Sequence, residues 1–429
     1  MRFLSGLFIP IIRNPQLGLI CAMNVFVMSG VGLVAPILSV YASTFSASAT
    51  LAGMIITLFG VGRLIVNLPA GFLSQRCGKR VFLMTGPVIL VIGAVGAALA
   101  GSLTTLIVCR FVQGLGSGIY MTIAQSMMAE ISTSQERGRT MALHQSAILV
   151  GTAIGPMAGG LIAGRFGLAA PFWAYAVVCV VAAVLAFFIT EPPAPSGNSS
   201  EDREATHPIR RPGSRRLFTS RVFTLICVVN FGVFFTRTAA QWQLIPLLAS
   251  SRFDMHVGMI GLLLTAQSLA NFAVLPITGM MVDRFGARPL TIISAIIIAA
   301  SLVVIAFGTS PLWLWAGMIV LGLGGGLNAP SIAAYATDVA PADSYGPAMG
   351  LMRTWGDAGF VLGPILVGSL ADFASVGTTG GLLANALLVA AAGIAVLSIG
   401  AGSPALVSPA ETTLFNDRRQ RVSINRARG

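Results

Sequence analysis

The sequence predicts an all-α membrane protein of twelve transmembrane helices, arranged as two pseudo-symmetric six-helix bundles. Three observations support this fold class. Of the 429 residues, 55% are hydrophobic and only 9% are charged, too few for the surface of a soluble domain of this size. Twelve apolar stretches are each long enough to cross a bilayer, which takes about 20 helical residues. A polar decapeptide also recurs at the same place in each half of the chain.

The apolar stretches form two groups of six. The first covers residues 17–41, 51–73, 81–101, 103–128, 141–163 and 170–190, and the second covers residues 222–249, 258–282, 288–308, 311–337, 346–370 and 378–402. We expect one helix in each, with ends accurate to a few residues. Residues 191–221 are rich in proline, serine and charge, which is typical of a flexible aqueous linker. The predicted domains are an N-terminal bundle (1–190), this linker (191–221), a C-terminal bundle (222–402) and a basic tail (403–429).

Basic residues are distributed unevenly between the two sides of these spans. If the N-terminus is cytoplasmic, the connectors on that side hold twenty Lys and Arg residues, whereas the opposite connectors hold only Arg165 and Arg252. The positive-inside rule then places both termini in the cytoplasm. We expect a multi-pass protein of the plasma or inner membrane, whose net charge of +12 meets anionic lipid rather than nucleic acid. The first residues, with an apolar run broken by Pro10, predict an interfacial lead-in rather than a secretory signal.

Motifs of enzymes and metal sites are missing from the sequence. Its five cysteines lack metal-ligand spacing, and neither H-E-x-x-H nor G-x-S-x-G occurs. A P-loop is excluded because the single lysine, Lys79, is followed by Arg80 rather than by Ser or Thr. We therefore predict no catalytic residue, no metal and no cofactor.

The repeated decapeptide lies between the second and third span of each half. It reads GFLSQRCGKR at residues 71–80 and GMMVDRFGAR at residues 279–288. The same offset of 208 residues aligns Gly155 with Gly363 and Pro156 with Pro364 without a gap. The chain is therefore a tandem repeat of one six-helix unit. We expect the glycines to allow tight turns and close helix approach, and the basic residues to hold the turn at the membrane surface.

Two parallel six-helix halves are typical of a carrier that rocks around a central site. The decapeptides resemble the loop motif of the major facilitator superfamily, usually written G-x-L-x-D-R-x-G-R-[RK], and the resemblance covers nearly the whole chain. It implies the major facilitator fold and alternating access. It also implies a charge network around the motif's Asp, a position held by Gln75 in the first copy and Asp283 in the second. The gating candidates in these loops are Gly71, Gln75, Arg76, Gly78, Arg80, Gly279, Asp283, Arg284 and Gly286.

The fourth span carries RFVQGLGSG at residues 110–118, which resembles the R-x-x-Q-G pattern of proton-coupled drug and metabolite exporters. Arg110 would lie within the bilayer, where a guanidinium is costly and needs a function or a partner. The alternative is a structural arginine that bonds helix-end carbonyls. We favour a role in coupling, with Gln113 on the same helical face.

The fifth span carries GTAIGPMAGG at residues 151–160, which resembles the antiporter motif of the superfamily's exporters. Small residues allow close helix packing, and Pro156 removes a backbone donor and bends the helix. A packing bend without transport significance is the alternative, but the full pattern favours export. The gating candidates here are Gly151, Gly155, Pro156, Gly159 and Gly160.

Charges inside the spans restrict the mechanism. Asp357 is the only acidic residue well within a span, against four arginines: Arg63, Arg110, Arg237 and Arg353. Because Arg353 and Asp357 are four residues apart on one helix, we expect an ion pair. Many proton-coupled relatives have a carboxylate on the first helix, and this chain has none. Asp357 is therefore the best candidate proton carrier and His144 the second, although a hydrogen-bonded interface histidine is an equal interpretation of His144.

Polar side chains on other spans are candidates for the substrate cavity: Asn24, Gln241, Trp242, Gln243 and Asn271. Amide and aromatic groups in an apolar cavity suit amphiphilic ligands, but they also make ordinary interhelical hydrogen bonds. If Arg110 and Arg237 face the cavity unpaired, anionic or neutral solutes are favoured over cationic ones.

We predict a secondary active transporter that works by alternating access, most simply proton-coupled efflux of small amphiphilic drugs or metabolites. A facilitator or importer of sugars or organic anions on the same fold is the alternative. The expected partners are the lipid bilayer, a small-molecule substrate and protons, with the proton gradient as energy source and a functional monomer.

Overall fold

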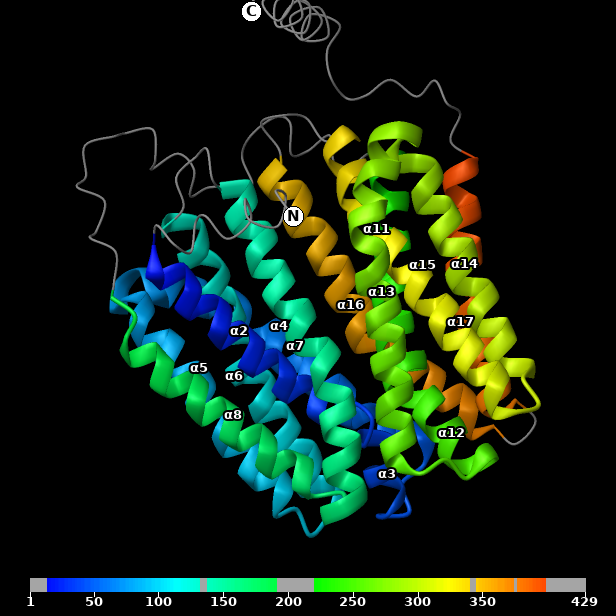
Figure 1. The fold of residues 1–429 in the computed structure, drawn as a ribbon, viewed down its shortest axis with the longest axis horizontal. Helices are drawn as coiled ribbons and strands as arrows, with labels where there is room; N and C mark the ends of the chain where they lie inside the picture. Colours follow the sequence, from blue (N-terminus) through cyan, green and yellow to red (C-terminus); the bar gives the residue numbers. More distant parts are fainter. Residues whose placement is uncertain (1–13, 132–136, 191–219, 340–344, 374–375, 399–429) are drawn as a thin grey trace, which may run out of the picture.

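The computed structural model describes residues 14–131, 137–190, 220–339, 345–373 and 376–398 (Figure 1). The predicted lead-in, the basic tail and all of the linker except residues 220 and 221 lie outside these ranges. The side chains of Gln75, Arg76 and Asp283 are also outside the described part of the chain.

The first half is built from α2 (Pro15–Val34), α3 (Leu38–Ser43), α4 (Ala49–Cys77), α5 (Lys79–Ala98), α6 (Leu103–Ile131), α7 (Arg137–Phe166) and α8 (Ala170–Phe187). The second half contains α11 (Arg221–Thr236), the π-helix η1 (Arg237–Leu244), α12 (Ile245–Phe253), α13 (Val257–Phe285), α14 (Ala287–Phe307), α15 (Pro311–Val339), α16 (Tyr345–Asp372) and α17 (Gly377–Leu397). Within the described ranges, twelve spans are long and apolar enough to cross a membrane. The predicted fold class is confirmed.

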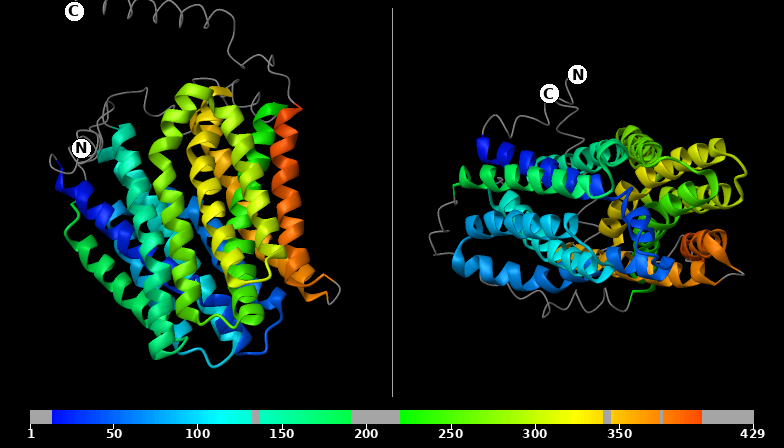
Figure 2. Two further views of the ribbon diagram at one scale, coloured as in Figure 1. Left: turned by 45° about the vertical axis from the view of Figure 1, so that its right-hand side comes forward. Right: turned by 90° about the horizontal axis from the view of Figure 1, so that it is seen from below.

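The two halves lie side by side as separate bundles (Figure 2). They meet along two pairs of helices, because α4 packs against α16 and α7 packs against α13. We call the end of the bundle where α8 ends and α11 begins the linker end, and the end that carries α3 and α12 the far end (Figure 1).

The predicted first span is two helices rather than one. α2 ends at Val34, three residues form a turn, and α3 begins at Leu38. Pro36 lies in this turn and has no N–H to continue the helical ladder. The last residues of the predicted span therefore belong to the separate short helix α3, at the far end of the bundle.

The repeated decapeptides form equivalent turns at the linker end. Gly78 and Gly286 each separate two helices with a single residue, at φ +87° and +84°, a conformation that only glycine adopts without strain. Arg80 donates to the carbonyl of Phe187 at the end of α8, and the equivalent Arg288 donates to Val396 near the end of α17. Arginine thus satisfies helix-end carbonyls in both repeats.

The glycines of the fifth span pack against two different helices. On α7, a Cβ added to Gly155 would lie 2.6 Å from the Gly32 Cα of α2, and one added to Gly159 would lie 1.8 Å from the Leu33 carbonyl oxygen. A Cβ on Gly160 would instead lie 2.9 Å from the Gly261 Cα of α13, in the other half. The motif therefore allows close backbone contact both within the first half and across the interface.

Candidate functional site

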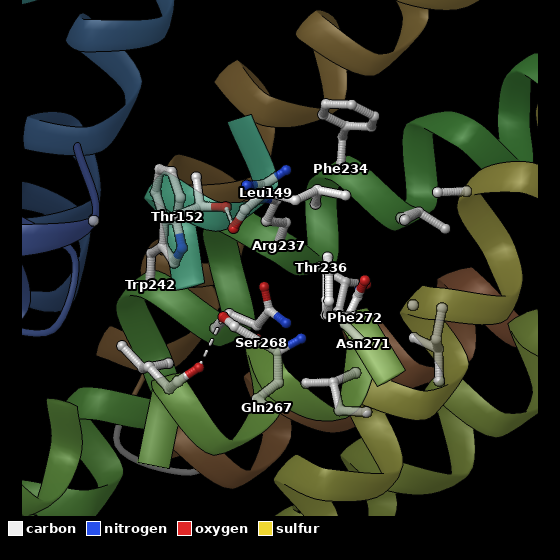
Figure 3. Close-up of a pocket in the computed structure, with 18 of the residues that line it drawn as sticks. Leu149, Thr152, Phe234, Thr236, Arg237, Trp242, Gln267, Ser268, Asn271 and Phe272 are labelled. Atoms are coloured by element: carbon white, nitrogen blue, oxygen red, sulfur yellow. Dashed lines mark hydrogen bonds between the residues drawn. The ribbon is translucent and has the colours of Figure 1, made fainter. Parts of the chain in front are cut away.

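A cavity of about 780 Å³ lies between the halves (Figure 3). The first half supplies six of its 24 lining residues: Gly32, Ala35, Gln145, Leu149, Thr152 and Pro156. The remaining lining residues come from α11, η1, α13, α14 and α15. The second half therefore forms most of the cavity wall.

The seventh span enters this wall as a π-helix. Hydrogen bonds in a π-helix span five residues rather than four, which displaces the side chains, and such segments recur at functional sites. In η1, the side chains of Arg237, Gln241 and Trp242 line the cavity. The Arg237 guanidinium carbon lies 5.5 Å from the centre of the Trp242 ring. The side chains were predicted from the sequence, but the π-helix that presents them was not.

Pro246 accounts for part of this local structure. Because proline has no N–H, the carbonyl of Trp242, four residues earlier, loses its α-helical donor. That carbonyl instead accepts a hydrogen bond from Ser39 Oγ of the first half at 3.0 Å. The N–H of Ile245 bonds to the Ala240 carbonyl, five residues before it. A contact between the halves is thereby built into the backbone of the cavity wall.

α13 supplies a second polar strip. Gln267, Ser268 and Asn271 line the cavity, on the side opposite Leu149 and Thr152 of α7 (Figure 3). Only Asn271 was predicted. The four-residue spacing of Gln267 and Asn271 in an otherwise apolar helix was the signal that could have identified the pair.

Two arginines from different halves lie around one aromatic pair. Trp242 and Phe360 of α16 meet edge to face, with ring centres 5.6 Å apart. Arg237 lies over Trp242, and the guanidinium carbon of Arg63 lies 5.7 Å from the centre of the Phe360 ring. Arg63 and Arg237 are close enough for their charges to repel, and Asp357 is close enough to attract Arg63.

Arg110 is set further inside the first half. It is fully buried, it donates to Gln113 Oε1, and its guanidinium carbon lies 4.3 Å from the centre of the Phe59 ring. It is not among the residues that line the cavity. The sequence pattern thus forms a real side-chain pair on α6, and the partner of the guanidinium is an amide rather than a helix-end carbonyl.

Hydrogen bonds between the halves close the far end. The carboxylate of Asp372, at the end of α16, accepts from the backbone N–H groups of Ala49 and Thr50 at 2.7 and 2.9 Å and from the Thr50 hydroxyl. It therefore caps the N-terminus of α4 from the other half. Gln243 Nε2 donates to the Ala49 carbonyl at 2.7 Å. Gln243 was predicted to line the cavity; it is fully buried in this contact instead.

The linker end is less closed. Arg353 Nη1 donates to Gln125 Oε1 across the halves at 3.2 Å, yet both side chains are exposed. Among the described residues, hydrogen bonds between the halves are thus more numerous at the far end than at the linker end.

Comparison with known sequences agrees with this architecture. The sequence profile described as Major Facilitator Superfamily matches residues 20–256 and 231–425. The chain belongs to the major facilitator superfamily. The family resemblance predicted from the sequence motifs is thereby confirmed.

Curated relatives of this transporter include drug-resistance proteins. It is 27% identical to the class C tetracycline resistance protein of Escherichia coli over 371 residues, which is 82% of this chain and 88% of that protein. It is 25% identical to multidrug resistance protein 2 of Bacillus subtilis, over 82% of this chain and 88% of that one. It is also 24% identical to an uncharacterized MFS-type transporter of Methanocaldococcus jannaschii, over 81% of this chain and 89% of that one.

Solved structures share the fold of the transporter at low sequence identity. A bacterial homologue of the human lysosomal transporter Spinster, in an inward-facing and unoccupied conformation, superimposes with a TM-score of 0.70 at 14% identity, covering 90% of this chain and 95% of that one. A POT family transporter in complex with a thioalcohol-conjugated peptide superimposes with a TM-score of 0.73 at 12% identity, covering 89% and 95%.

Two of the transporter's predicted site residues lie away from the cavity, in a network inside the first half. Asn24 Oδ1 accepts from the Tyr120 hydroxyl at 2.8 Å, and Asn24 Nδ2 lies 2.8 Å from His144 Nδ1. All three residues are buried. Because Asn24 Nδ2 can only donate, His144 Nδ1 accepts. Asn24 therefore does not line the cavity, and His144 matches the interpretation as a hydrogen-bonded histidine.

The ion pair expected between Arg353 and Asp357 is not formed in the described part of the chain. Arg353 turns towards Gln125 of the first half, and Asp357 lies near Arg63. Spacing along one helix indicated a local pair, but each of the two side chains interacts with a group on the neighbouring half. The packing of α16 against the first half decides this arrangement.

The loop glycines divide into two kinds. Gly78 and Gly286 are required by the backbone, as described above. In contrast, a Cβ on Gly279 would meet nothing within 4 Å and one on Gly71 only a methyl group of Thr122 at 4.0 Å. The expectation of close helix approach does not hold at these two positions. Arg284 is exposed and lies over the ring of Phe285.

Proposed function

We propose that this transporter carries out proton-coupled efflux of small amphiphilic compounds by alternating access, as a monomer. The observation that carries the proposal is a cavity between the halves, with most of the described hydrogen bonds that join the halves lying at the far end. Drug-resistance relatives and the small-residue contacts of α7 with α2 and α13 support export. The asymmetry of basic residues supports a cytoplasmic linker end and cytoplasmic termini.

Asp357 is the proposed proton carrier. It is the only acidic residue well within a span, it is partly exposed, and the charge of Arg63 acts on it across the two halves. Protonation of Asp357 removes its attraction for Arg63, so the proton occupancy of one side chain changes the force between α4 and α16. Arg110 supports this role indirectly. Its guanidinium bonds to Gln113 on α6 and lies over Phe59 of α4, the helix that also carries Arg63.

The test is transport in inverted membrane vesicles with an imposed pH gradient, using a hydrophobic cationic dye and an organic anion in parallel. Gradient-driven accumulation of either probe, lost in Asp357→Asn and retained in Asp254→Asn, supports the proposal. Asp254 is a suitable control because it is an exposed acidic residue in the far-end connector after α12. Downhill equilibration that ignores both the gradient and the variant contradicts it.

A facilitator of organic anions is the second candidate. The observation in its favour is the excess of intramembrane arginines over acidic groups, together with the absence of a carboxylate on α2. The same vesicles separate the two candidates, because a facilitator equilibrates the anion without concentrating it.

A further inference from the structure

We propose that Arg63 and Arg237 form a binding site for the anionic group of the substrate, with Trp242 contacting its planar apolar body. This proposal rests on the proposed transport function and names its substrate class: amphiphilic organic anions such as aromatic carboxylates or sulfonates.

Positive charge around the cavity exceeds the negative charge that could compensate it. Arg63 and Arg237 have no hydrogen bond or ion pair with another described residue, and the Arg63 Nε is buried without a partner. Asp357 attracts Arg63, but Arg353 opposes that attraction. Arg110 bonds to a neutral amide, so it contributes no compensating negative charge. A cation within the bilayer is costly unless it is paired. An anionic ligand supplies the missing charge.

Both arginines lie around the cavity wall. Arg237 lines the cavity; Arg63 is not among the lining residues, but it lies over the Phe360 ring, which meets Trp242 edge to face, and its charge acts on Arg237 from the opposite half. Guanidinium groups bind carboxylates and sulfonates through two parallel N–H donors. With one arginine on each half, a bound anion also reduces the repulsion between Arg63 and Arg237. Binding and approach of the halves are thereby linked at the same two charges.

The cavity wall also selects the rest of the ligand. Trp242 lines the cavity next to Arg237, and Leu149, Phe234 and Phe272 add apolar surface (Figure 3). Aromatic walls favour a planar body and the amides of Gln267 and Asn271 can bond to its polar substituents. A strongly cationic compound would meet both arginines with the wrong sign.

The test measures binding rather than transport. The full chain is purified into phosphatidylcholine nanodiscs and titrated calorimetrically with three probes of one shape: 1-naphthoate, neutral 1-naphthamide and 1-naphthylmethylammonium, with empty nanodiscs as blank. We expect naphthoate to bind the wild type about tenfold more tightly than the other two, equivalent to ~1.4 kcal/mol. Equal affinity of the three probes, preference for the cation or absence of naphthoate binding overturns the proposal, and none of these results depends on a variant that must fold.

Variants then locate the site. Arg237→Gln and Arg63→Gln are each expected to weaken naphthoate binding about tenfold and to leave naphthamide within a factor of about two. Arg165→Gln is the matched control, because Arg165 also lies over a phenylalanine ring but is exposed and away from the cavity. Loss of naphthamide binding as well, or an equal loss in Arg165→Gln, contradicts an anion site at these residues.

The outcome separates this proposal from the transport function. Anion-selective binding without gradient-driven transport would leave the anion site standing and remove proton-coupled efflux. Pumping of a cationic dye with no naphthoate binding would leave efflux standing and remove the anion site.

Discussion

The two halves are copies of one sequence repeat but give unequal numbers of polar side chains to the cavity. In the first half, large polar side chains bond to one another in the interior, as in Asn24 with Tyr120 and His144. In the second half, Arg237 and Gln267 face the cavity. At the 208-residue offset, Arg110, Gln113 and Lys79 of the first half correspond to Met318, Leu321 and Ala287 of the second. The second half has buried bonds of its own, such as Thr236 with Asn385, but it gives the cavity most of its polar lining, whereas the first half gives only Gln145 and Thr152.

The largest expected effect concerns helix contact. Gly159 of α7 corresponds to Val367 in the second half, and Gly159→Val makes the repeats alike. Because even a Cβ would lie 1.8 Å from the Leu33 carbonyl oxygen, we expect destabilisation of about 3 kcal/mol or more and loss of monodisperse protein. Thermal unfolding in detergent, with Gly350→Val as control, measures this. A Cβ on Gly350 meets nothing within 4 Å. Equal melting temperatures of the two variants would show that the close contact is not required.

The next effect compares a polar residue inside the first half, Asn24, with a polar residue that lines the cavity, Gln267. Asn24→Leu removes the partner of both Tyr120 and His144, and each buried polar group left unsatisfied costs about 1–3 kcal/mol. Gln267→Leu on the cavity wall is expected to change stability by less than about 1 kcal/mol and to change ligand affinity instead. Chemical unfolding followed by ligand titration tests both. If Gln267→Leu destabilises as much as Asn24→Leu, the division between the halves is wrong.

A third effect concerns the seal between the halves. Asp372→Ala removes the cap on α4 that closes the far end. We expect the equilibrium to shift by about 1–2 kcal/mol towards a state open at the far end. Spin labels on exposed far-end residues of each half would show longer distances by pulsed electron resonance. Unchanged distances in Asp372→Ala would assign the seal to the helix packing and to Gln243 instead.

The smallest effect compares equivalent acidic residues at the linker end. In the first half, Lys79 forms an ion pair with Glu130; in the second, the equivalent positions are Ala287 and Asp338. Asp338 lies beyond the apolar span Pro311–Ala336, and partial burial raises the pKa of its carboxyl. A raised pKa means that the charged form destabilises the folded state, so stability rises as the pH falls through that pKa.

Asp338→Asn is therefore expected to increase the free energy of unfolding at pH 7 by less than about 1 kcal/mol and so to raise the melting temperature slightly, with the gain shrinking as the pH falls. Glu130→Gln is expected to lower it, because the buried Lys79 loses its counter-charge. Melting curves across pH for both variants test the pair of signs. The same sign for both would mean that the repeats are equivalent at this end.

Much of this architecture could be predicted from the sequence, because hydrocarbon thickness sets the length of each span and the repeat sets the topology. Gly78 and Arg80 were identified by their motif, and their local geometry follows from it. The π-helix at Arg237–Leu244 could not be predicted, since it depends on Pro246 removing one donor while Ser39, about 200 residues away, supplies another.

The site was only partly predictable for a related reason. Residue type indicated Arg237, Trp242 and Asn271, and all three line the cavity. Asn24 and Gln243 have the same chemical character, but their neighbours on other helices draw them into internal or inter-half bonds. Sequence spacing describes one helix, whereas the direction of a buried amide is decided between helices.

The unequal division of the cavity wall has a mechanical consequence. Six of the 24 lining residues lie on the first half, so a ligand would contact mainly the second half. We expect the ligand to stay with the second half when the two halves move relative to each other. Release then requires that the first half, which carries α2, α7 and Arg63, moves away from the ligand. Substitutions on α7 would therefore change the rate of ligand release, whereas substitutions on α13 and η1 would change ligand selectivity.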